Sequence, residues 1–316
     1  MADNAGVFHF RAIPLAPLQA TIDVLRTSRI SLFGTCHENT EKELEAAFQR
    51  RFPSPDRIPR HIAIELDTER FKSLAKVHDL EGSEKRPVYF AKEPDSAETS
   101  KWGLFARALV RAELGLTSLG IRRKTGHDMA FGAKLGLSDE KTLYLVDRDF
   151  SALRDEFNRE MQHRMSRLGQ SEFMEWSSFV RQAQQVFEGL ATLYRPLPIS
   201  DPQISPRHTI RSGARCFYRA EDAETCNVLA AINDEWLQKT KSIGMESVYD
   251  LLMTKRNRFI ARHLVQIMRN HPGQDVVFVT GALHTVGLLE ILSRRSDMEV
   301  DVTYTDLSRI FKKEYP

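Results

Sequence analysis

The 316-residue sequence has few cysteines, no excess of charge of either sign and no long apolar run. Its three cysteines, an odd number without close spacing, do not make a disulfide framework and indicate a reducing compartment. The 45 basic and 43 acidic side chains leave a net charge of +2, which argues against a nucleic-acid partner. No stretch reaches the roughly 18 apolar residues of a membrane span, and the N-terminus does not resemble a signal peptide. We therefore expect a cytoplasmic protein without a membrane span.

Short apolar runs alternate with helical patterns at both ends of the chain. The apolar runs predict strands at residues 30–33, 61–66, 142–146, 275–280 and 299–304. Apolar positions at helical spacing predict helices at residues 40–51, from 67 or 68 towards 77, at 102–113 and at 127–135. Continuous apolar strands belong to sheets that are covered on both faces. The expected fold class is therefore α/β, a mostly parallel central sheet with helices on both faces.

The middle of the chain is predicted to be mainly helical. Residues 150–195 alternate apolar and charged positions with a period near 3.6, and helices are expected again at 220–240 and 247–269. We interpret residues 1–316 as a single domain, with residues 150–270 as a helical insertion or lid. We interpret residues 1–15 as a loose lead-in and residues 81–100 as a surface loop.

Polar residues follow four of the predicted strands at their carboxyl ends. Residues 34–37 (GTCH) end the first strand and residues 281–284 (GALH) end the fourth, so each segment places a histidine three residues after a glycine. Glu65 lies near the end of the second strand, and Asp147 and Arg148 follow the third. Because ligands of open parallel sheets bind outside these strand ends, we expect one polar site here. We expect its glycines to form tight turns that a Cβ atom would hinder.

The candidate residues allow two kinds of chemistry. His37, Glu65 and His284 match the ligand set of many catalytic divalent-metal sites. Glu65 stands in an apolar strand, where a carboxylate needs a partner or a cation. Alternatively, one histidine acts as a general base that a carboxylate orients. Arg256 and its neighbour Asn257 lie on a predicted helix, where Arg256 could bind a substrate carboxylate or pair with Glu65.

These motifs, in this order, resemble those of the TraB/PrgY family, which includes the Tiki proteins. They are residues 32–37 (LFGTCH), 62–67 (IAIELD) followed by Arg70, 126–130 (GHDMA), 147–149 (DRD), 255–261 (KRNRFIA) and 281–287 (GALHTVG). Two positions depart from the family pattern, because Asp128 and Lys255 stand where the family usually has glutamate.

The resemblance implies an α/β fold similar to that of the erythromycin-esterase and ChaN-like proteins, with helical insertions. Tiki proteins are described as metal-dependent peptidases that use the two histidine motifs and the strand glutamate, and PrgY-like members are linked to limiting peptide pheromone activity. The resemblance also implies a divalent ion (Mn, Co or Zn) held by His37, Glu65 and His284. Arg256 and Asn257 would then hold the substrate or the developing oxyanion.

The sequence leaves three functions open at this site. The first is a metal-dependent hydrolase of a peptide or a related amide or ester. The second is an esterase-like hydrolase with a histidine base and no metal, and the third is a regulatory protein that binds a peptide or small ligand without turnover. Arg70, Asp147 and Arg148 are the further residues expected to contact the substrate, and a homodimer is left open. A nucleotide-binding protein ranks lower, because no G-x-G-x-x-G follows the first strand and no P-loop is present.

Overall fold

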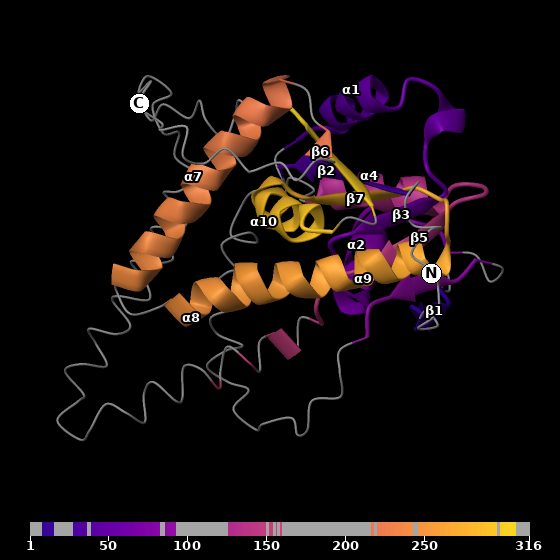
Figure 1. Ribbon diagram of the computed structural model, residues 1–316. Helices are drawn as coiled ribbons and strands as arrows, with labels where there is room; N and C mark the ends of the chain where they lie inside the picture. The colour runs from indigo at the N-terminus through magenta and orange to yellow at the C-terminus, as the bar shows by residue number, and fades with distance from the viewer. Residues whose placement is uncertain are drawn as a thin grey trace.

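A computed structural model of the chain describes nine continuous segments and a few single residues. They are residues 8–15, 28–36, 39–82, 86–92, 126–149, 216–217, 220–242, 246–295 and 298–307, with residues 152, 153, 156 and 159. Within these residues, eight strands form one sheet in the order β1-β4-β5-β3-β7-β2-β8-β6. Every neighbouring pair is parallel, and helices lie on both sides of the sheet (Figure 1). The predicted α/β fold class is confirmed.

The elements have the following bounds. The strands are β1 (Phe10–Ala12), β2 (Arg29–Thr35), β3 (His61–Ile64), β4 (Val88–Phe90), β5 (Thr142–Leu145), β6 (Cys216–Phe217), β7 (Val276–Gly281) and β8 (Glu299–Tyr304). The helices are α1 (Glu41–Arg51), α2 (Thr68–Val77), α4 (His127–Leu137), α7 (Ala220–Ser242), α8 (Glu246–Tyr249), α9 (Arg256–Asn270) and α10 (Ala282–Ser293). A 3-10 turn η2 (Pro55–Arg57) follows α1, and a π-helical turn η4 (Asp250–Lys255) joins α8 to α9.

Two of the sequence predictions are wrong at one edge of the sheet. Residues 1–15, expected to be a loose lead-in, contain β1, and residues 81–100, expected to be a surface loop, contain β4. The two strands pair with each other, and β4 also pairs with β5. Each has only three residues, too few to show the periodicity on which a sequence prediction depends. The predicted helix at 102–113 lies outside the described residues.

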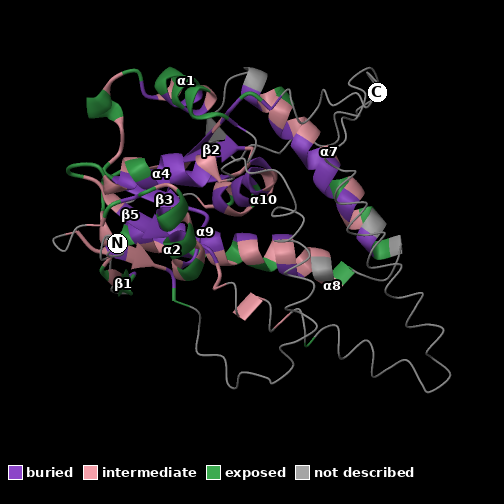
Figure 2. Cartoon of the chain, turned by 180° about the vertical axis from the view of Figure 1, so that it is seen from behind, coloured by how far each residue is buried: buried purple, intermediate pink, exposed green. Residues whose placement is uncertain are grey.

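Side chains of the central strands alternate between two apolar cores. In β7, Val277 and Val279 pack with residues of α1, α2 and α4. Val276 and Phe278 of the same strand pack with residues of α7, α9 and α10. The central strands are therefore buried on both faces, as Figure 2 shows, which explains why they are apolar throughout.

Two helices begin at the carboxyl edge of the sheet with side-chain caps. Thr40 caps α1 in a capping box with Glu43, whose carboxylate accepts the Thr40 backbone N–H at 2.8 Å. Asp67 caps α2, and its Oδ1 accepts the backbone N–H groups of Glu69 at 2.8 Å and Arg70 at 2.9 Å. The expected starts of both helices are confirmed, and the cap of α2 fixes Asp67 at the edge.

The neighbouring strands β2 and β7 form the switch point of the sheet. After β2 the chain passes through α1 to β3, and after β7 it passes through α10 to β8. The two helices pack in opposite cores. Such a reversal of direction marks the ligand site of open α/β sheets. Gly34 pairs with Thr280 and Thr35 with Gly281, so the two glycine-histidine segments begin side by side.

The predicted insertion at residues 150–270 is described mainly in its C-terminal part. There, Ile260, Leu264 and Ile267 of α9 share a core with Val276 and Phe278 of β7, so α9 covers one face of the sheet. A lid role for the rest of this segment stays a prediction. Among the helices that the structure describes, none combines the length and the apolar character needed to cross a membrane.

Candidate active site

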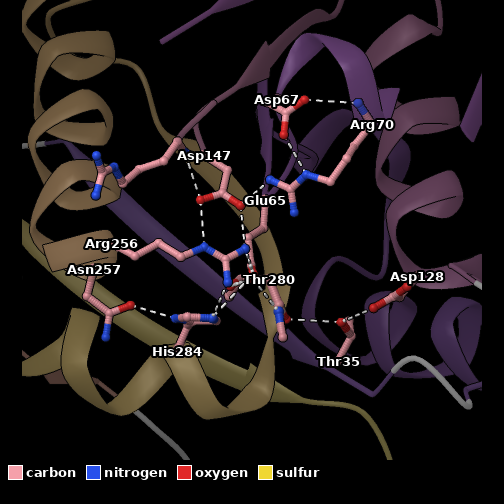
Figure 3. A network of polar contacts seen from close by, with 12 residues as sticks. Thr35, Glu65, Asp67, Arg70, Asp128, Asp147, Arg256, Asn257, Thr280 and His284 are labelled. Atoms are coloured by element: carbon pink, nitrogen blue, oxygen red, sulfur yellow. Dashed lines mark hydrogen bonds and ion pairs between the residues drawn. The ribbon is translucent and has the colours of Figure 1, made fainter. Parts of the chain in front are cut away.

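Charged and polar side chains converge at the carboxyl ends of β3, β5 and β7 (Figure 3). Glu65 follows β3 directly, Asp147 lies two residues after β5, and His284 lies in the first turn of α10. Arg256 reaches them from the start of α9, just after the π-helical turn η4. Such turns are frequent at functional sites. The structure therefore brings together four of the residues predicted from the sequence.

The guanidinium group of Arg256 is the centre of this cluster. Its Nε donates to Asp147 Oδ1 at 2.7 Å, and its Nη2 donates to Glu65 Oε1 at 2.6 Å and to Asp147 Oδ2. Its Nη1 lies 3.2 Å from Nε2 of His284. Burial lowers the pKa of Arg256, but the charges of Asp147 and Glu65 outweigh burial and raise the pKa above its ordinary value. Arg256 is therefore a permanent cation inside the site.

Asp147 is 1% exposed and binds two guanidinium groups. Its Oδ2 accepts from Arg70 as well as from Arg256, and Arg70 Nε also donates to Asp67 Oδ2 at 2.6 Å. Burial raises the pKa of Asp147, but the charges of Arg256 and Arg70 outweigh it and hold the pKa well below its usual range. Burial lowers the pKa of Arg70, but the charges of Asp147 and Asp67 and the hydrogen bond to Asp147 together outweigh burial and raise it. The cluster is thus an ion network in which each charge depends on its partners.

Glu65 is held by β7 on one side and by Arg256 on the other. Its Oε2 accepts from Thr280 Oγ1 at 2.5 Å and from the Gly281 backbone N–H at 2.8 Å. Its Oε1 lies 3.3 Å from Nε2 of His284. Burial raises the pKa of Glu65, but the charge that His284 carries when it is protonated, the charge of Arg256 and the hydrogen bond from Thr280 outweigh burial and lower it. Glu65 is therefore a fixed carboxylate.

The hydrogen bonds of His284 define its tautomer. Its Nδ1 lies 2.7 Å from Asn257 Oδ1, and its Nε2 faces Nη1 of Arg256. A guanidinium can only donate, so in the neutral ring Nε2 is the acceptor and Nδ1 carries the proton that Asn257 accepts. In this form His284 presents the lone pair of Nε2 towards Arg256 and Glu65, as a general base requires, and a proton taken up there would face Glu65 Oε1.

A Cβ atom would be hindered at Gly34, as expected, but at Gly281 it would meet only an ordinary contact, 3.6 Å from Glu65 Oε2. Neither Gly34 nor Gly281 has a positive φ, and Gly281 has an ordinary backbone with φ −57°. A Cβ at Gly34 would lie 2.6 Å from the ring of Tyr304. A Cβ at Gly287 would lie 2.3 Å from Nδ2 of Asn257. Gly287 thus leaves the room that Asn257 needs in order to reach His284.

Three residues in or beside the cluster were not predicted as site residues. Thr280 binds Glu65, and its only signal in the sequence is its position directly before Gly281 at the end of an apolar strand. Thr35 Oγ1 lies 2.9 Å from Oδ2 of the buried Asp128 and 3.0 Å from the Thr280 carbonyl oxygen. Thr35 therefore links the end of β2 to helix α4 and to β7, the strand whose Thr280 binds Glu65.

The side chain of Arg148 pairs outside the cluster, although its backbone N–H donates to Asp147 Oδ1 at 2.8 Å. Nη1 of Arg148 donates to Glu156 at 2.8 Å, and Lys255 Nζ donates to the other oxygen of Glu156 at 2.8 Å. Arg148 is therefore engaged in a separate ion pair beside Asp147. His37 lies outside the described residues, so its approach to Glu65 and His284 stays a prediction.

The described donor atoms do not fit a bound metal ion. Nε2 of His284 and Oε1 of Glu65 both contact the guanidinium of Arg256, which occupies the space between them with a positive charge. A metal would need these lone pairs, and Arg256 would repel it. Across the described segments, no group of three or more His, Cys, Asp or Glu side chains is arranged to hold a metal. The third expected ligand, His37, is not among them.

Comparison with protein-family models, curated proteins and solved structures found no match for this chain. The resemblance to the TraB/PrgY family, and the metal and peptidase activity that it implies, therefore stay predictions.

Proposed function

We propose that the chain hydrolyses an ester or amide bond of a peptide or related small molecule, with His284 as the general base and without a metal ion. The observation that supports this most directly is the orientation of His284. Its Nδ1 lies 2.7 Å from Asn257 Oδ1, and its Nε2 faces a cluster at the carboxyl edge of a parallel sheet. Ligands of such sheets bind at this edge.

The charges around His284 favour uptake of a proton. The cluster contains three carboxylates and two guanidinium groups, contributed by Glu65, Asp67, Asp147, Arg70 and Arg256. While His284 is neutral, the cluster carries one negative charge in excess. A proton on the His284 ring makes the positive and negative charges of the cluster equal in number. Glu65 Oε1, 3.3 Å from Nε2, would pair with the imidazolium that forms.

Arg256 supplies a donor for the developing oxyanion. Its Nε and Nη2 are fixed by Asp147 and Glu65 at 2.7 and 2.6 Å, whereas the contact of Nη1 with His284 is longer, at 3.2 Å. Substrate and water would replace this longest contact. Nη1 would then donate to the carbonyl oxygen as it gains charge. The Arg256 side chain is 15% exposed, so the cluster is not sealed.

The reaction balances with these groups alone. Nε2 of His284 takes a proton from water as the water oxygen attacks the carbonyl carbon. The tetrahedral intermediate collapses, the bond to the leaving oxygen or nitrogen breaks, and the imidazolium returns its proton to the leaving group. The products are a carboxylic acid and an alcohol or amine.

The test is hydrolysis of p-nitrophenyl acetate and of a fluorogenic peptide library, with and without EDTA. We expect turnover that EDTA does not change, that His284→Ala removes, and that the matched change His78→Ala at the far end of α2 retains. Loss of turnover with EDTA and recovery with Mn²⁺, Co²⁺ or Zn²⁺ would contradict the metal-free proposal. Peptide binding without product after long incubation would contradict hydrolysis altogether.

A further inference from the structure

A hollow of about 510 Å³ lies against α9 and the C-terminal end of α10. The described residues that line it do not include any residue of the cluster around Arg256. Four arginines line it, namely Arg258, Arg262 and Arg269 of α9 and Arg295 just after α10. Among the described residues that line it, none is acidic. We refer to this hollow as the arginine groove.

The arginine groove also has apolar walls. Val265 of α9 and Leu292 of α10 contribute to its lining and are buried parts of one core. Leu15, which also lines the groove, is 87% exposed, and no other large apolar side chain of the described segments is as exposed. Apolar surface that remains exposed beside a rim of charge is typical of a binding surface.

Three of the arginines that line the groove are like charges on a single helix, α9. Arg258 and Arg262 are four residues apart, and Arg269 lies seven further on, so their side chains share one face. Like charges at this spacing destabilise a helix. In the part of the chain described here, none of these three guanidinium groups takes part in an ion pair. By contrast, Arg294 beside the groove pairs with Glu290.

We propose that the arginine groove binds an acidic amphipathic helix of a protein partner. The partner's apolar face would pack on Val265, Ile291 and Leu15, and its carboxylates would pair with the arginines of α9. From Arg258 to Arg269, α9 advances by about 16 Å at 1.5 Å per residue, which matches three turns of a helix laid along it. The described part of the lining contains no aromatic side chain on which a base could stack, and its concave apolar wall suits a side-chain anchor better than a phosphate backbone.

The proposal is tested with a designed probe, an 18-residue fluorescein-labelled helical peptide with leucine on one face and glutamate on the other. Binding is followed by fluorescence anisotropy at low and at physiological salt. We expect saturable binding that Arg262→Glu weakens by about tenfold or more, because it places a like charge at the centre of the interface. The matched control Arg294→Glu reverses an arginine outside the groove and should leave binding unchanged.

Two altered peptides keep the test independent of any effect on folding. Replacing glutamate by lysine, or leucine by serine, should abolish binding to the unchanged protein. The proposal is overturned if the lysine peptide binds equally well, if Arg262→Glu has no effect, or if phosphatidylserine vesicles or duplex DNA bind while the acidic peptide does not. His284→Ala should bind the peptide normally, so this proposal and the hydrolytic one succeed or fail separately.

Discussion

Strand β3 carries a buried polar cluster at each end, and the two clusters are built on different principles. Beyond its carboxyl end, Glu65 joins a network of carboxylates and guanidinium groups. At its amino end, His61 joins an uncharged chain, in which Nδ1 lies 3.1 Å from the Tyr144 hydroxyl and Nε2 lies 2.7 Å from Gln274 Oε1. The Tyr144 hydroxyl in turn lies 3.0 Å from Nε2 of His271.

The same burial has opposite outcomes at the two ends. Burial lowers the pKa of His61 to about 4 and also lowers that of His271, so both imidazoles stay neutral at pH 7. At the other end, opposite charges outweigh burial and keep Glu65 and Asp147 ionised. A protein can thus satisfy buried polar groups either by pairing charges or by suppressing them. Of the two clusters, only the charged one lies at the carboxyl edge of the sheet, where the proposed function places proton transfer.

The largest predicted loss of stability follows from removing one carboxylate charge from the charged cluster. Asp147→Asn keeps the shape of the side chain but leaves Arg256 and Arg70 without their shared carboxylate. We expect the free energy of unfolding in urea to fall by about 3–5 kcal/mol, because a buried charge loses its partner.

The matched change at the other end is Tyr144→Phe, which removes a neutral hydroxyl between two imidazoles. Here we expect a loss of about 1–3 kcal/mol, the cost of leaving buried polar atoms without a hydrogen bond. Equal losses in Asp147→Asn and Tyr144→Phe would show that the charged network is not held by its ion pairs.

A smaller effect on stability, but a specific one on function, is expected from Gly287→Ala. The new methyl group would lie 2.3 Å from Nδ2 of Asn257 and must displace it. Overpacking of this kind costs about 1–3 kcal/mol. If the proposed function holds, displacement of the residue that orients His284 should lower turnover by about a hundredfold.

The control for Gly287→Ala is Gly273→Ala, at a glycine with φ +74° where a Cβ meets no atom within 4 Å. This control strains the backbone far from His284, so it should lower stability and spare turnover. ¹⁵N NMR of the His284 ring supplies a second readout, since the Nδ1–H signal should change only in Gly287→Ala. An unchanged Nδ1–H signal in Gly287→Ala would contradict the positioning role of Asn257.

The sequence predicted the parts of the charged cluster that depend on strand ends. Glu65, Asp147 and His284 each follow an apolar run, and parallel strands bring such positions to one edge. The sequence also offered Arg256 as a partner of Glu65, and the structure has this pair at 2.6 Å. The sequence could not show that the same guanidinium also contacts Asp147 and His284, because that depends on how α9 packs.

The neutral cluster gave no signal in the sequence. Tyr144 reads as one more apolar residue of a buried strand, and His61 as the first residue of another. His271 lies 127 residues from Tyr144, so no local pattern joins the two. Hydrogen bonds between uncharged side chains far apart in the chain become visible only when the strands are placed next to each other.

The smallest predicted effect is on the pH dependence of the free energy of unfolding. It distinguishes the two clusters without a substitution of Asp147 or Tyr144. The folded-state pKa of His61 is about 4, below the ordinary value of 6.5, so the unfolded chain binds the proton more tightly. The free energy of unfolding should therefore fall by roughly 1–2 kcal/mol through His61 as the pH drops from 7 to 5.

The carboxylates contribute little between pH 7 and pH 5. Glu65 and Asp147 have lowered pKa values, so the stability that they contribute is lost only as the pH falls below about 4.5. The urea midpoint of His61→Gln should depend less steeply on pH than that of the unchanged protein. Burial also lowers the pKa values of His271 and His263, so these two histidines contribute to the pH dependence that remains in the variant. An equally steep dependence in His61→Gln would mean that the histidine is not held neutral by burial, and the contrast between the two ends of β3 would be lost.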